Sequence, residues 1–440
     1  MKTSLEKNFL RDLYKRITGD EITLTSNNIS RQPVHVVYGG ADKFKSDVSA
    51  KLGKFALKTL TEYAGNYRAF FEALEIPVSD ISEIVYERII EKLKREPVED
   101  YRIDFEDGYG IRPDEEEDKS AEFVARETAK GIFENSLPPF FGIRIKPLTN
   151  EFKERAVRTL DIYLTTLLSE TSGKLPDNFL VTLPKITSSG EITVLVELLK
   201  KLEEINSLPP GSIKFEMMIE NPQVMFNEKG ECGLHALISA SEGRCFAAHF
   251  GAYDFTSSLD ISAKNQTLDH PLCNFVRSVM KIAFAGTGIF LSDGATNILP
   301  VPKFRNENLT DEEKKINREL IFKAWRTSFK DINHSLNSGI YQGWDLHPAQ
   351  IPVRYAAVYS FFLDELRSAS ERLRNFIYKA AQVSLSGNVF DDAASAQALL
   401  NFFARGLNCG AFTDAEIKQT GLVAEEIKTK SFIKILESGK

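Results

Sequence analysis

The 440-residue sequence has few cysteines and no long apolar run. A membrane-spanning helix needs about 18 or more consecutive apolar residues, so no membrane partner is expected. The four cysteines, at positions 232, 245, 273 and 409, are scattered, which favours a reducing compartment over a disulfide framework. The first residues mix charges without an apolar core, so we expect no secretory signal and a cytoplasmic location.

An excess of basic residues is also missing. The chain has 55 Lys and Arg against 62 Asp and Glu, a net charge of -7, so nothing in its overall field suggests a nucleic-acid partner. No Gly-x-Gly-x-x-Gly motif follows a predicted strand, and no Gly-Lys-Ser/Thr phosphate loop occurs. Nucleotide-binding folds therefore lose their best sequence support.

What the sequence does contain is a regular alternation of short apolar segments and longer segments with helical periodicity. Eight strands are predicted, at residues 33–38, 101–106, 140–145, 178–183, 212–220, 244–250, 286–291 and 340–346. A helix follows each of them. Eight strand–helix units predict a (β/α)8 (TIM) barrel.

Two segments exceed what the barrel needs. Residues 47–96 keep helical periodicity over a longer stretch than one connecting helix requires, so we predict a helical insertion there. We assign the barrel to residues 1–350, and to 351–440 the last barrel helix and a C-terminal helical extension.

Charged residues gather where the predicted strands end. The run Asp104-Phe105-Glu106-Asp107-Gly108 places three carboxylates within four residues, which an ordinary strand leaving the core could also explain. The other strand ends carry charges too: Arg144, Lys146, Lys185, Glu220, Asp254, Asp293, Asp345 and His347. Because barrel active sites lie at the C-terminal ends of the strands, this pattern favours a functional site.

The residue types indicate cation-assisted chemistry. Carboxylates from separate strands suit a divalent cation, which takes oxygen ligands from one or two side chains, substrate and water. Glu220 shares its strand face with Met218 and Glu216, and would reach the mouth if that face is the barrel interior. Arg144 has the fork geometry to bind a carboxylate or an enolate oxygen.

Seven short motifs stand at the predicted strand ends, in this order: Asp104-Phe105-Glu106-Asp107-Gly108, Ile143-Arg144-Ile145-Lys146-Pro147, Leu183-Pro184-Lys185-Ile186, Met218-Ile219-Glu220, Gly251-Ala252-Tyr253-Asp254, Leu291-Ser292-Asp293-Gly294 and Leu346-His347-Pro348-Ala349-Gln350. In sequence and in order they resemble the motifs of the citrate lyase β-subunit / HpcH–HpaI aldolase superfamily. This resemblance is the most specific signal in the chain. It spans residues 33 to 350.

This resemblance implies a set of roles. Glu220 and Asp254 would hold Mg²⁺ or Mn²⁺, and Arg144 would bind the substrate carboxylate and the enolate. Glu106 and Asp107 would line the pocket and order Arg144 and water.

The sequence also departs from the family pattern. Lys146 stands where the family usually has Asn, and Asn221-Pro222 replaces the Thr-Ala that commonly follows the metal Glu. Some relatives place an acid from a C-terminal segment over a neighbouring subunit's site. Asp391 and Asp392 are candidates for that role, with a helix N-cap as the alternative.

Three further residues have open roles. His35, on the first strand, is a substrate-binding or general-base candidate, although a hydrogen-bonded core histidine is the commoner case. Lys185 is a substrate-binding candidate; a Schiff base is the alternative to charge stabilisation. His347 precedes a proline and is expected to fix its loop.

The prediction is a metal-dependent carbon–carbon lyase or aldolase that acts through an enolate. Its partner would be a small 2-oxo or hydroxy acid or the CoA thioester of one, and we expect a homo-oligomer. The competing hypothesis is a catalytically silent barrel that binds a dicarboxylate or serves as a subunit of a complex.

Overall fold

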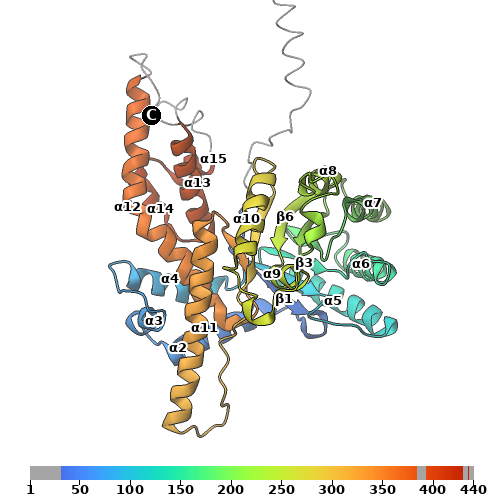
Figure 1. The fold of residues 1–440 in the computed structure, drawn as a ribbon, viewed down its shortest axis with the longest axis horizontal. Helices are drawn as coiled ribbons and strands as arrows, with labels where there is room; N and C mark the ends of the chain where they lie inside the picture. Colours follow the sequence, from blue (N-terminus) through green and yellow to red (C-terminus); the bar gives the residue numbers. More distant parts are fainter. Residues whose placement is uncertain (1–30, 384–392, 430–434, 436–440) are drawn as a thin grey trace, which may run out of the picture.

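The computed structural model describes residues 31–383, 393–429 and 435. Eight parallel strands pair in chain order and close into a barrel (Figure 1), which confirms the predicted fold. The strands are β1 (His35–Gly40), β2 (Asp100–Asp104), β3 (Phe140–Arg144), β4 (Phe179–Leu183), β5 (Lys214–Ile219), β6 (Cys245–Phe250), β7 (Phe290–Ala295) and β8 (Gln342–Trp344).

The barrel is enclosed by helices, whose apolar sides pack on the outward-facing side chains of the strands. In chain order these are α5 (Asp114–Glu134), α6 (Lys153–Glu170), α7 (Ser189–Ile205), α8 (Leu234–Ala240), α10 (Pro271–Ala283), α11 (Asp311–Asn337) and α12 (Ile351–Val383). The short helix α9 (Ala252–Ser257) lies between β6 and α10.

The seventh strand differs from its predicted position at residues 286–291. It begins four residues later, at Phe290. Gly286 and Gly288 have φ values of 75° and 79°, in the left-handed region, so they form the turn after α10 rather than extended backbone. Asp293 consequently lies inside the strand instead of at its end.

The insertion and the C-terminal extension form a helical unit beside the barrel (Figure 1). It consists of α2 (Val48–Tyr63), α3 (Tyr67–Ala73) and α4 (Ser82–Arg95), with α13 (Ala393–Cys409), α14 (Asp414–Ile417), α15 (Ala424–Thr429) and the long α12. Arg88 of α4 donates to the Ala411 carbonyl and pairs with Glu416 at 2.8 Å. None of the described helices is long and apolar enough to span a bilayer.

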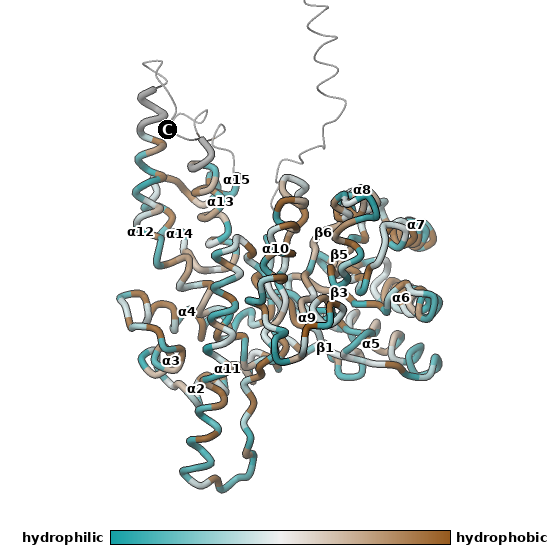
Figure 2. The backbone as a smooth tube through the Cα atoms, in the orientation of Figure 1, coloured by the Kyte–Doolittle hydropathy of each residue, from teal (hydrophilic) through white to brown (hydrophobic). Residues whose placement is uncertain are grey.

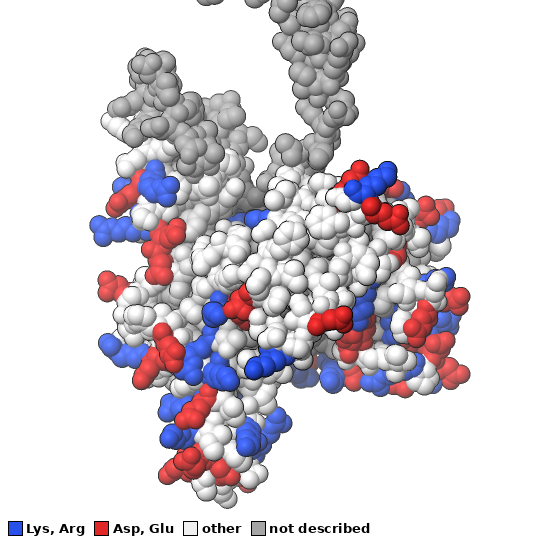
Figure 3. Space-filling model, viewed as in Figure 1, with Lys and Arg blue, Asp and Glu red and all other residues white. Residues whose placement is uncertain are grey.

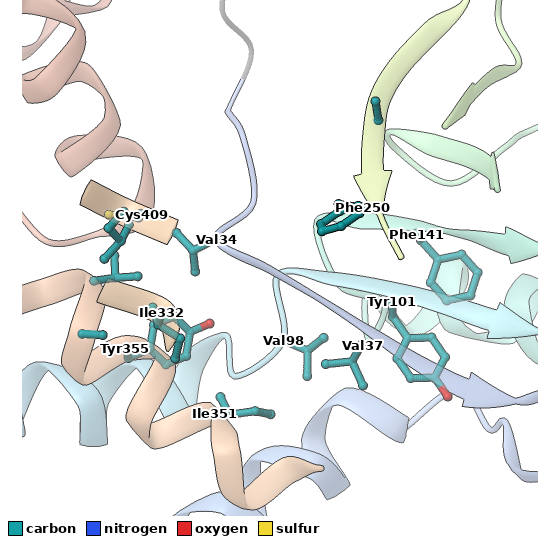
Figure 4. Close-up of a cluster of buried hydrophobic side chains, with 14 of the residues drawn as sticks. Val34, Val37, Val98, Tyr101, Phe141, Phe250, Ile332, Ile351, Tyr355 and Cys409 are labelled. Atoms are coloured by element: carbon teal, nitrogen blue, oxygen red, sulfur yellow. The ribbon is translucent and has the colours of Figure 1, made fainter. Parts of the chain in front are cut away.

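A continuous apolar core joins this unit to the barrel. Figure 4 shows Val34, just before β1, near Cys409 at the end of α13 and Tyr355 of α12. The hydroxyl of Tyr359 donates to the Cys409 carbonyl at 3.3 Å. The extension is therefore packed against the end of the barrel opposite the strand C-termini.

The interior of the barrel is charged rather than apolar. Arg102 of β2 donates through Nε and Nη2 to the two oxygens of Glu216 on β5, each at 2.9 Å, and its Nη1 bonds to Asp100. All three side chains are buried. The hydroxyl of Tyr38 on β1 also donates to Glu216, at 3.2 Å, so this layer forms the floor under the mouth of the barrel.

Because Arg102 neutralises two buried carboxylates, Arg102→Ala should lower the free energy of unfolding by about 3–5 kcal/mol. Urea unfolding measures this loss. The matched control is Arg126→Ala, which breaks exposed ion pairs to Glu122 and Glu170 and should cost about 1 kcal/mol or less. Similar losses in both variants would contradict a structural role for the interior layer.

Candidate active site at the barrel mouth

Arg144, the last residue of β3, is the buried cation at the centre of the mouth. It lies directly beside Asp104, its register partner at the end of β2. Nε and Nη2 of Arg144 donate to the two oxygens of Asp104, at 2.7 and 2.6 Å. This bidentate pair fixes the plane and direction of the guanidinium.

Two aromatic rings further restrict Arg144. The guanidinium carbon lies 4.7 Å from the ring centre of Tyr38 and 5.5 Å from that of Trp344, within cation–π range. Nη1, which Asp104 leaves open, makes a sulfur contact to Met218 at 3.7 Å. Tyr38, Met218 and Trp344 were not predicted as site residues. Asp104 belongs to the acidic run at residues 104–107 that the sequence analysis singled out, and it ends its strand beside Arg144.

Lys185 connects the acidic groups of the site. It follows β4 with φ of 52°, a left-handed conformation that turns its backbone N–H toward Glu220 Oε2 at 2.8 Å. Its ammonium group donates to Glu106 Oε1 and to Asp107 Oδ1, the latter at 3.0 Å. These two carboxylates raise the pKa of Lys185 above its ordinary value despite burial.

Within the acidic run, Asp104 accepts the hydrogen bonds from Arg144, and Glu106 and Asp107 lie beside them. Glu106 Oε2 lies 3.1 Å from Arg144 Nη1, yet it is buried without a hydrogen bond in the described structure. Burial, with the nearby charge of Asp107, raises the pKa of Glu106. Arg144 and Lys185 lower the pKa of Asp107, which stays exposed at the rim.

Glu220 follows β5 on the face of the strand that also carries Glu216, and it is buried at the mouth as expected. Asp254 stands in α9, exposed at the rim. Between them, Gly251 allows close approach: a Cβ there would be 2.3 Å from Glu220 Cγ. Burial and the charge of Asp254 raise the pKa of Glu220 to about 8.

The absence of ion pairs to Glu220 and Asp254 among the described residues fits a divalent-cation site. Neither Glu220 nor Asp254 forms an ion pair with any side chain that the structure describes, although the charge of Arg144 acts on both carboxyl groups from a greater distance. The same residues contain no group of three or more His, Cys, Asp or Glu arranged for a metal. Mg²⁺ needs only one or two protein carboxylates, so the donor set fits that ion.

His35 is not brought to the mouth. Its Nδ1 pairs with Asp345 at 2.7 Å, its Nε2 accepts from the Glu99 backbone N–H at 3.1 Å, and its ring lies 5.5 Å from that of Tyr355 on α12. It therefore points to the helix layer, away from Tyr38, and the predicted position at the substrate is wrong. Asp345 also pairs with Arg354 and is structural.

Other predicted mouth residues likewise support the scaffold. Asp293 is buried with Arg277 and Ser335. The ring nitrogen of His347 accepts from the Ala349 N–H at 3.2 Å, which confirms that this residue fixes its loop. Lys146 donates to the buried Glu117 of α5 at 2.7 Å and to the Phe105 carbonyl. Asp391 and Asp392 lie outside the described residues.

The fold and the charged mouth define the protein as a (β/α)8 barrel with a candidate active site at the strand C-termini. A family described as a domain of unknown function, DUF6986, matches residues 22–435, and the chain belongs to this family. No curated protein matches the sequence.

Solved structures share the architecture. A citrate lyase from Burkholderia xenovorans LB400 is 17% identical, with a TM-score of 0.54 over 89% of this chain and 97% of that one. A malate synthase from Haloferax volcanii, in a pyruvate and acetyl-CoA ternary complex, is 12% identical over 93% and 98%, with a TM-score of 0.46. CitE of Mycobacterium tuberculosis, with magnesium and acetoacetate, is 14% identical over 76% and 92%, with a TM-score of 0.39.

The citrate lyase, with a TM-score above 0.5, shares the barrel fold with this chain. At these identities the likeness establishes the fold alone.

The raised pKa of Glu220 gives a stability prediction for the metal-free protein. An unfolded glutamate titrates near pH 4.3, whereas folded Glu220 titrates at about 8. Between these values the folded state holds a proton that the unfolded state has lost. The free energy of unfolding should therefore fall with rising pH, by up to about 1.4 kcal/mol per pH unit.

Urea unfolding in the presence of a chelator, at several values between about pH 5 and pH 8, measures this slope. Glu220→Gln lacks the titrating carboxyl group, so its free energy of unfolding should not show this fall. The variant should therefore gain stability relative to the wild type as the pH rises. Parallel pH profiles for the two proteins would contradict the assignment.

Proposed function

We propose that this protein is a carbon–carbon lyase or aldolase that acts through the enolate of a 2-oxo acid or acyl thioester. The observation that supports this most strongly is the buried Arg144, which hydrogen bonds to Asp104 hold in place. The positive charge of Arg144 acts on the neighbouring Glu220. A fixed cation beside a metal-type carboxylate pair suits a reaction in which negative charge develops on an oxygen.

Glu220 and Asp254 would hold the divalent cation, Mg²⁺ or Mn²⁺. When bound, such an ion supplies electrophilic stabilisation of negative charge on the substrate oxygens. Glu220 is held by the Lys185 backbone N–H, so its carboxylate has a defined direction before the ion arrives. Asp254 is exposed, which leaves the rim side of the pair open to substrate and water.

Arg144 would bind the substrate carboxylate and the developing enolate oxygen through the N–H groups that Asp104 leaves free. Because Nε and Nη2 are already bonded and the ring of Tyr38 covers one face, reorganisation during the reaction is small. Glu106, buried with a raised pKa and an unbonded Oε2, can hold a proton at that atom.

Lys185 is better suited to charge positioning than to a Schiff base. A Schiff base needs a neutral amine, and this ammonium group is bonded to two carboxylates that raise its pKa. The group that leaves or joins is either an aldehyde or an acyl-CoA thioester, and both remain candidates.

The decisive test is a panel of hydroxy acids, with and without their CoA thioesters, assayed for release of pyruvate, oxaloacetate or glyoxylate. We expect turnover that needs Mg²⁺ or Mn²⁺ and is lost in Glu220→Gln together with metal binding. Absence of metal-dependent turnover in the wild type, with Glu220→Gln binding Mg²⁺ as well as wild type, would refute the proposal. Dicarboxylate binding without turnover would instead support the silent barrel.

A second prediction concerns Arg144. Arg144→Lys keeps the charge but cannot make the bidentate contact with Asp104 and leaves the ring stack, so kcat/KM should fall by about 100-fold or more. The matched control is Arg112→Lys, at a partly exposed ion pair with Glu116, which should change kcat/KM by less than about twofold. Equal activity of Arg144→Lys and wild type would exclude the assigned role.

A further inference from the structure

Arginines in the interior of this protein are paired with acids. The buried ones among the described residues are Arg102, Arg144, Arg155, Arg244, Arg277 and Arg354. Each of them forms an ion pair with an Asp or Glu. Blue and red side chains also lie next to one another at both sides of the molecule in Figure 3. Such pairing is expected, because a guanidinium taken out of water is costly without a negative partner.

Arg405, half-buried on α13, has no such partner. Its guanidinium lies over the ring of Tyr341, 4.2 Å from the ring centre, and its Nη1 donates to Gln32 Oε1. No Asp or Glu among the described residues pairs with Arg405, and the groups that act on its charge are Tyr341 and Cys409. A ring face and an amide oxygen carry no full negative charge. The positive charge of Arg405 is therefore unbalanced in the part of the chain that the structure describes.

Arg405 lies at the end of the barrel opposite the mouth, where the C-terminal extension meets the starts of the strands. Gln32 stands shortly before β1, and Tyr341 stands directly before β8. The helix α13 is largely hydrophobic (Figure 2), and Figure 4 shows Val34 near Cys409 at the end of this helix. Apolar surroundings screen a charge less than water does, so an unbalanced cation here attracts an anion more strongly than one at the surface.

A narrow cavity lies beside the guanidinium. Its lining includes Gln32, Tyr341, Arg405 and Asn408, and contains no Asp or Glu. The inner space is about 10 Å³, which is room for a single particle of about the size of water. The side-chain amide of Asn408 makes no hydrogen bond within the part of the chain that the structure describes, so it is available as a second donor. The cavity thus combines a cation and a free N–H donor with no acid.

A second cation adds to the positive potential of this region. Lys281, near the end of α10, donates to the Gly339 carbonyl at 2.9 Å and forms no ion pair with a described residue. Burial and the charge of Arg405 lower the pKa of Lys281, and burial lowers the pKa of Arg405. Two cations that repel each other without a shared acid favour a bound anion.

We propose that the cavity beside Arg405 binds a compact monovalent anion of the size and charge of chloride, held by the Arg405 guanidinium and the Asn408 amide. The inner space is too small for phosphate or sulfate. A water molecule would fit as well, but it would leave the charge of Arg405 unbalanced. Because α13 carries Arg405 and the lining includes Gln32 before β1, the anion would fasten the C-terminal extension to the barrel. This site is separate from the mouth and does not depend on the reaction proposed there.

Crystals of the full chain soaked in sodium bromide test the site directly, because bromide replaces chloride and scatters X-rays anomalously. We expect an anomalous peak within about 3.5 Å of a guanidinium nitrogen of Arg405 in the wild type, and none there in Arg405→Met. Wild-type crystals in which the cavity holds water without bromide would overturn the proposal. So would density for a carboxylate of the chain itself against Arg405, since the charge would then be balanced from within.

Urea unfolding in solution gives a second measurement, with chloride replaced by gluconate at constant ionic strength so that screening stays the same. Between ~10 and ~300 mM chloride, the unfolding equilibrium constant of the wild type should fall by about 15-fold, the effect of a site with a dissociation constant of roughly 10 mM. Arg405→Met should lose this dependence, whereas Arg367→Met, at an exposed arginine of α12, should keep it. A wild type that does not respond to chloride, or an Arg405→Met variant that responds as strongly, would contradict the assignment.

Discussion

The bidentate pair between Asp104 and Arg144 is the interaction on which the candidate site depends. The two residues end neighbouring strands in direct register, so the barrel itself brings them together. A guanidinium buried at this depth would be costly without a carboxylate in such geometry. The orientation of the Arg144 guanidinium then decides which of its N–H groups stay free of Asp104.

The charged barrel interior and the mouth form one connected arrangement. Glu216 holds Arg102 and the Tyr38 hydroxyl, and the ring of Tyr38 lies against Arg144. The floor of the site is thus a polar network instead of the layers of branched apolar side chains common in these barrels. The hydrogen bonds of this network also fix the position of the Tyr38 ring against which Arg144 lies.

At the mouth, Lys185 connects the acids near Arg144 with the carboxylate of Glu220. Lys185 bonds through its ammonium to Glu106 and Asp107 and through its backbone to Glu220. The acids near Arg144 and the proposed metal ligand are thereby positioned by the same turn after β4. Glu220 and Asp254 form no ion pair with the described side chains, and their mutual repulsion raises the pKa of Glu220, which is consistent with a site that receives a cation.

The sequence by itself determined the eight strand–helix units and most of the charged strand ends, because these depend on local periodicity and on where apolar runs stop. It misplaced β7, since the left-handed glycines at 286 and 288 form a turn that apolar neighbours disguise. Only the tertiary structure decided what each charge does. Asp104 and Arg144 are 40 positions apart, and His35 and Asp345 are 310 apart. Strand register and facing, which arise when the barrel closes, send the first pair into the mouth and the second into the helix layer.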